Sequence, residues 1–87
     1  MKVRILYRPK SEHARRVEEF AHDIDRQQSI HPELIDVDTR EGNALMSLYD
    51  IVSHPAVVVT KDDGTLIQHW VGDQLPLMSE VAAFARS

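Results

Sequence analysis

The chain has 87 residues, of which 43% are hydrophobic and 28% are charged, and its formal net charge at pH 7 is −4. This composition is that of one small folded domain, so it argues against a disordered chain, and the acidic balance argues against nucleic-acid binding. The sequence contains no cysteine, which excludes disulfides, thiolate metal ligands and every mechanism that needs a thiol.

The first third of the chain predicts a strand followed by a long helix. Polar and apolar residues alternate over residues 2–8, which is the period of a strand. Ser11 is a good N-cap, and Glu12 would lie in the first helical turn, where the helix dipole favours an anion. Apolar residues at helical spacing follow, so we predict a helix from about Ser11 to Gln28. They are Ala14, Val17, Phe20, Ala21 and Ile24.

The middle of the chain predicts a second strand, a shorter helix and a buried strand. Leu34, Ile35 and Val37 stand among acidic residues in a strand pattern. Residues 43–49 follow as a helix, whose inward side we expect to include Ala44, Leu45, Leu48 and Ile51. The run Ala-Val-Val-Val at residues 56–59 is typical of a strand that is buried on both faces.

The last third predicts a hairpin and a final helix. Residues 61–64 form the turn, because Asp-Gly supplies the positive φ angles that tight turns require. Residues 66–71 return as a fourth strand, which the Gly72-Asp73 pair ends. Pro76 can occupy the first turn of the last helix. The expected buried side of that helix comprises Leu77, Val81, Phe84 and Ala85.

The resulting order is β-α-β-α-β-β-α over residues 1–87, without a repeat or a linker. Two strand-helix units followed by a hairpin and a helix predict a single α/β domain. Its sheet would be mixed and four-stranded, with helices on both faces.

Several local features, in this order and spacing, resemble a thioredoxin-type domain over nearly the whole chain. The features are the Ile-Asp-Val-Asp segment at residues 35–38, the Leu-Tyr pair at residues 48–49, the Ser-His-Pro segment at residues 53–55, the Asp-Gly hairpin and Gly72. The resemblance implies a thioredoxin-like fold in which Pro55 is a cis-proline that faces the start of the first helix.

The chain departs from this family at the start of the first helix. Thioredoxins and glutaredoxins carry a Cys-x-x-Cys motif there, whereas this sequence reads Ser11-Glu12-His13-Ala14. Dithiol exchange needs a thiolate, and a serine hydroxyl has no disulfide chemistry. The sequence therefore excludes thiol-disulfide oxidoreductase activity and favours a module that binds a protein or a peptide.

The same resemblance implies that His13 and His54 lie close together, near Arg8 and Lys10. Such a pocket would suit an anion or a peptide carboxylate. The plainer alternative is two partly exposed histidines that fill a loop surface. We predict neither a metal nor another cofactor, because zinc or copper needs three or four ligands and only these histidines and Glu12 are candidates. Ser11 is expected to act as a cap and not as a nucleophile, so a cysteine-independent hydrolase has little support.

Glutathione binding is a further alternative that the resemblance implies. Glutaredoxin-like proteins hold the tripeptide at the cis-proline strand and near the last turn. The corresponding residues here would be His54, Pro55, Gly72 and Asp73. Without an attacking cysteine, the interaction would be binding alone.

KaiB-type circadian clock proteins offer a second resemblance. They share a thioredoxin-like first half, a serine near the helix start and a Gly-Asp pair near the last helix, as at Ser11 and Gly72-Asp73. The Asp63-Gly64 hairpin favours the thioredoxin type instead. Both resemblances imply that such a chain can work purely through interactions, and Trp70, expected at a sheet edge, makes a homodimer a further option.

Location and partners follow from what the sequence lacks. No apolar run is long enough to cross a bilayer, and Met1 is followed by a strand pattern and not by a secretory signal. The basic residues near the start of the chain are not interleaved with aromatic ones. We therefore expect a cytoplasmic protein with no membrane or nucleic-acid partner.

Overall fold

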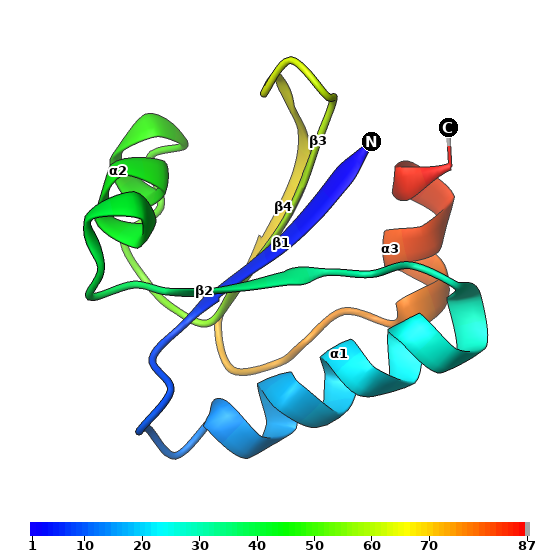
Figure 1. Ribbon diagram of the computed structural model, residues 1–87, viewed down its shortest axis with the longest axis horizontal. Helices are drawn as coiled ribbons and strands as arrows, with labels where there is room; N and C mark the ends of the chain where they lie inside the picture. The colour runs from blue at the N-terminus through cyan, green and yellow to red at the C-terminus, as the bar shows by residue number, and fades with distance from the viewer. Residues whose placement is uncertain (87) are drawn as a thin grey trace.

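The computed structural model describes residues 1–86 and has the predicted order of elements (Figure 1). The strands are β1 (Lys2–Tyr7), β2 (Glu33–Asp36), β3 (Ala56–Thr60) and β4 (Leu66–Val71). The helices are α1 (Ala14–Gln28), α2 (Arg40–Leu48) and α3 (Met78–Ala85).

The four strands form one mixed sheet in the order β2-β1-β3-β4. β1 pairs with β2 in parallel, and the other two pairings are antiparallel. α1 and α3 lie on one face of this sheet and α2 lies on the other, as Figure 1 shows. The predicted α/β fold is therefore confirmed.

β3 is the central element of the core, since each of its five residues is buried. Val57 and Val59 face α1 and α3, where they pack in a cluster with Val17, Ile24 and Val81. The alternate residues of β3, Ala56 and Val58, face the α2 side, in a cluster with Leu6, Ile35 and Ile51. The prediction of a strand buried on both faces is confirmed.

The hairpin between β3 and β4 is also present. Gly64 has φ +93° and its N–H donates to the Lys61 carbonyl oxygen over 2.9 Å. A residue with a side chain is strained at such a φ, so the Asp-Gly sequence accounts for the turn. This hairpin is the feature that favoured the thioredoxin type over the clock-protein alternative.

The start of α1 differs from the prediction. The helix begins at Ala14 with His13 at the N-cap position, and its first turn contains no acidic residue. Ser11 is not the cap, because it closes a preceding turn in which its hydroxyl donates to the Arg8 carbonyl oxygen over 2.6 Å. Glu12 lies in the loop before the helix and not in the first turn. Ser11 therefore belongs to the turn at residues 8–11, which lies before the helix.

α2 begins three residues earlier than predicted, and a different side faces the sheet. Thr39 is its N-cap, and the threonine hydroxyl accepts from the Gly42 N–H over 3.0 Å. This start places Gly42, Leu45, Met46 and Tyr49 on the inward side. Ala44 and Leu48, which were predicted to face inward, are exposed, whereas Ile51 is buried as predicted.

α3 begins at Met78, so Pro76 lies before the helix and not in its first turn. The Glu80 carboxylate accepts from the Leu77 N–H over 3.1 Å, and this contact defines the later start. Leu77 is exposed, contrary to the prediction, whereas Val81 is buried. Within residues 1–86, no helix is both long and apolar enough to cross a membrane.

Candidate functional site

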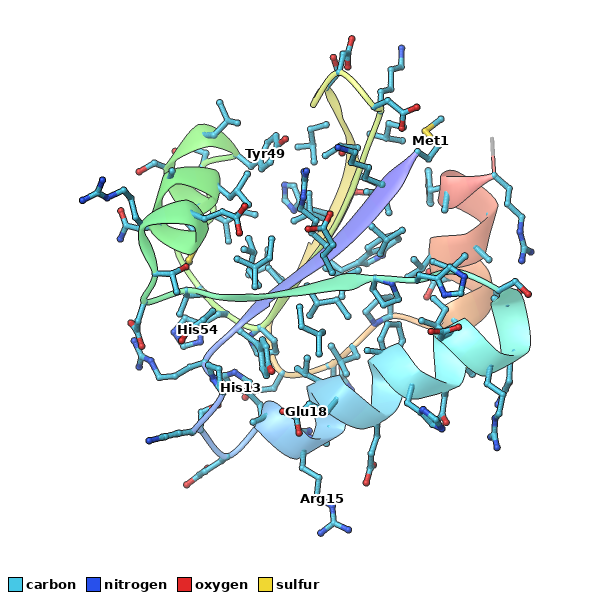
Figure 2. All side chains as sticks on the ribbon, in the orientation of Figure 1. Met1, His13, Arg15, Glu18, Tyr49 and His54 are labelled. Carbon is cyan, nitrogen blue, oxygen red and sulfur yellow. The ribbon has the colours of Figure 1, made fainter. Side chains whose placement is uncertain are left out.

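The candidate site lies where two loops meet at one end of the sheet, the β1–α1 loop and the loop from α2 to β3. These loops bring His13 and His54 together, with their ring centroids 5.4 Å apart and their planes inclined by 57° (Figure 2). The two residues are far apart in sequence, so their proximity is a property of the fold, and it agrees with the geometry that the sequence resemblance implied.

His13 is buried, with 8% of its surface exposed, so it is not the partly exposed loop side chain of the plainer alternative. Its Nε2 atom accepts from the Arg8 backbone N–H over 3.3 Å, which requires that nitrogen to be unprotonated. Burial and the nearby His54 ring lower the pKa of the His13 imidazole. Arg16 and Arg8 lower this pKa further, and Asp73 opposes them. The site therefore favours neutral His13.

His54 is partly buried and leads into a cis peptide bond with the buried Pro55. In the part of the chain that the structure describes, the buried His54 Nδ1 atom has no hydrogen-bond partner. The backbone N–H and C=O groups of Val52, Ser53 and His54 are likewise unpaired within residues 1–86. Unpaired backbone groups beside a strand are able to pair with another extended chain.

Gly72 joins this site through the backbone. Its N–H donates to the Pro55 carbonyl oxygen over 2.9 Å, and its φ of +118° favours glycine. Asp73 follows it and lines a groove of ≈ 460 Å³ between α1 and the start of α3. The other lining residues are Arg16, Gln74, Leu75, Leu77 and Glu80.

Arg8 does not supply the free positive charge that the anion pocket would need. Its guanidinium donates to both oxygens of Asp38, over 3.0 and 3.1 Å. This hydrogen-bonded pair lowers the pKa of the Asp38 carboxyl. Sequence reasoning did not assign Asp38 to the site. The available signal was its place just beyond β2, because carboxyl ends of neighbouring parallel strands meet at one edge of a sheet.

The remaining candidates do not form a catalytic or metal-binding group. Ser11 directs its proton to the Arg8 carbonyl and not to a histidine, so no activated serine arises in this arrangement. Glu12 is exposed in the loop. Among the described residues, no three His, Asp or Glu side chains are grouped so that they would hold a metal ion.

The comparisons with known proteins place this geometry in a known fold. No protein-family model matches the chain, and no curated protein sequence matches it either. Thioredoxin 1 of Thermosipho africanus is similar in structure, with a TM-score of 0.68 and 19% identity over 99% of this chain and 91% of that one. Fasciola hepatica thioredoxin has a TM-score of 0.66 and 14% identity over 97% of this chain and 76% of its own.

A third similar structure comes from a study of the thiol resolving mechanism in yeast mitochondrial 1-Cys peroxiredoxin via glutathione/thioredoxin systems. The TM-score is 0.66, with 18% identity over 97% of this chain and 74% of that one. Similarity at these identities shows the fold alone. The chain thus has a thioredoxin-like fold, and it lacks the Cys-x-x-Cys motif because it has no cysteine.

Proposed function

We propose that this protein is a non-redox domain that binds an extended segment of a partner protein, or a peptide, at the face where the Ser11–Ala14 segment meets His54 and Pro55. Ser11, Glu12 and His54 are the accessible residues of this face. The absence of cysteine leaves no group for thiol-disulfide exchange at the start of α1. The thioredoxin-like fold is consistent with a role that does not involve redox chemistry. We also propose a cytoplasmic location.

The observation that carries this proposal is the unpaired backbone before β3. Within residues 1–86, the N–H and C=O groups of His54 have no partner, although Pro55 and Gly72 beside it are hydrogen-bonded. An extended segment of a partner can form main-chain hydrogen bonds with these unpaired N–H and C=O groups, and neighbouring side chains add specificity. Val52, of which 91% is exposed, supplies an apolar contact at the same segment.

The test begins with selection of binders from a random peptide library on the immobilised wild-type protein. Amide chemical shifts of the labelled protein then map the site of each selected peptide. We expect shifts at His54, Gly72 and the Ser11–Ala14 loop. His54→Ala should weaken binding by about tenfold, which corresponds to the loss of about 1.4 kcal/mol of binding free energy.

His22→Ala is the matched control, because His22 is an exposed histidine on α1 away from the two loops. This variant should bind the selected peptides like the wild type. Selection that yields no specific peptide, or shifts that map around His22 and leave His54 unchanged, would contradict the proposed binding surface.

A second candidate is the binding of glutathione, supported by the groove beside Asp73. Arg16 and Asp73 both line this groove, so it offers a cation for a carboxylate and an anion for an amino group. The tripeptide carries both charges at its γ-glutamyl end. Addition of millimolar glutathione should shift the amides of His54, Gly72 and Asp73, and Asp73→Asn should reduce the response. An unchanged spectrum would remove this candidate.

A further inference from the structure

β4 forms one edge of the sheet, and no other strand of residues 1–86 pairs with its outer side. Proteins commonly protect such edges with charged residues or proline. The six residues of β4 include no Lys, Arg, Asp, Glu or Pro. The register irregularity in its pairing with β3 lies at the Leu66 end, so the half that ends at Val71 is regular.

The register identifies the backbone groups that face outward. Gly72 donates to Pro55, and Trp70 lies opposite Val57, so alternation along an antiparallel pair directs the backbone of Trp70 toward β3. The N–H and C=O groups of His69 and Val71 consequently point away from the sheet. One contact agrees with this assignment, because the His69 N–H donates to Oε1 of Gln68 over 2.9 Å and not to β3.

We propose that β4 pairs antiparallel with β4 of a second copy of this chain, with His69 of each copy opposite Val71 of the other. In this register the outward N–H and C=O groups at both positions all find a partner. The two-fold axis passes beside Trp70, and the exposed side chains of His69 and Val71 come together on one face of the joined sheet.

The charge of the strand and its symmetry favour a second copy over a different protein. A strand with no Lys, Arg, Asp or Glu offers a charged partner strand no fixed opposite charge, and it brings no two such like charges together when two copies meet. A second copy also presents the same donors and acceptors in reciprocal positions. Val71 is 43% exposed, so its side chain has apolar surface left to bury.

The Gln68 side chain competes with this pairing. Its Oε1 atom accepts from the His69 N–H, which is the donor that the second copy needs for its Val71 carbonyl oxygen. Dimerisation must therefore displace Gln68. Removal of the Gln68 amide should strengthen association, which distinguishes this interface from contact elsewhere on the surface.

Sedimentation equilibrium over a range of concentrations up to about 1 mM tests the proposal, since association as weak as Kd about 1 mM would still be detected. The wild type should show a monomer-dimer equilibrium. Val71→Lys should weaken association by about tenfold or more, because each dimer would carry two added charges on the joined edge. Gln68→Ala should strengthen it.

Leu48→Lys is the matched control, since it adds the same charge at an exposed apolar residue of α2, outside β4, and should leave the dimer unchanged. Circular dichroism checks that each variant folds, and if Val71→Lys does not fold, the Gln68→Ala comparison decides. A wild type that stays monomeric, or a dimer that neither β4 variant alters, would overturn the proposal. Binding of β4 to a foreign strand without self-association would overturn it too.

Discussion

The two faces of the sheet are covered in different ways. On the first face, α1 buries the large side chains of Val17 and Ile24 against β1 and β3. On the second face, the only buried residue of α2 is Gly42, which has no side chain. The α1 face is therefore stabilised by fully buried apolar side chains, whereas α2 combines partly buried side chains such as Leu45 and Met46 with a close backbone approach at Gly42.

The candidate site lies at the junction of these two layers. His13 belongs to the start of α1, and His54 belongs to the loop that returns from α2. His13 and His54 belong to neither apolar cluster, so the two histidines of the site are separate from the side chains that form the larger core. Four predictions test this difference between the two faces, and they run from the largest expected loss of stability to the smallest.

Ile24→Ala should lower the free energy of unfolding by about 2 to 5 kcal/mol, because it removes a fully buried side chain and leaves a cavity in the α1 face. Chemical denaturation measures the loss. Val52→Ala is the control: its valine is exposed, so the change should stay within about 0.5 kcal/mol. Similar losses in both variants would show that the α1 core is not packed as described.

Gly42→Ala should lower the free energy of unfolding by about 1 to 3 kcal/mol through a steric clash and not through a cavity. A Cβ atom at this position would lie 2.1 Å from the Asp36 carbonyl oxygen, which is backbone and has little freedom to move. Asn43→Ala, at the exposed neighbouring position, is the control and should be nearly neutral. Denaturation that cannot separate the two variants would argue against the close approach of α2.

Tyr49→Phe should lower the free energy of unfolding by about 1 kcal/mol. The Tyr49 hydroxyl donates to the Gly64 carbonyl oxygen over 2.6 Å and so links the end of α2 to the β3–β4 hairpin. Phe keeps the ring and removes only this hydrogen bond. Faster amide exchange in the hairpin should accompany the loss, and unchanged stability would mean that the bond contributes nothing net.

Acid should weaken the fold through His13, as the smallest of these effects. The pKa of His13 is lowered in the folded protein, so the unfolded chain binds the proton more readily. The stability that neutral His13 provides is complete above its ordinary value of about 6.5, and it is lost as the pH falls through the lowered folded pKa.

Denaturation curves at several pH values measure this effect. His13→Gln should make the acid-dependent loss smaller, because it removes the group that titrates. His22→Gln, on the exposed side of the same helix, should retain the full loss. An equal acid dependence in the wild type and His13→Gln would exclude this histidine as the cause.

The sequence predicted much of the geometry of the candidate site. The resemblance placed His13 beside His54 and Pro55, and the rings lie together in the structure. It did not place the Arg8–Asp38 pair, which leaves no free guanidinium for an anion. Whether the site binds a ligand stays a prediction.

The sequence by itself determined the order of the elements, the buried strand at residues 56–59, the Asp-Gly hairpin and the absence of thiol chemistry. These features depend on local periodicity, on the φ angles that glycine permits and on which atoms the side chains contain. Only the tertiary structure decided where α1 and α2 begin and which side of α2 faces the sheet. The Ser11 hydroxyl bonds back to Arg8 and does not cap α1, whereas the Thr39 hydroxyl accepts from Gly42 and caps α2. Both bonds join residues three apart, but which of them forms depends on how each helix packs against the sheet, and a local pattern does not contain that packing.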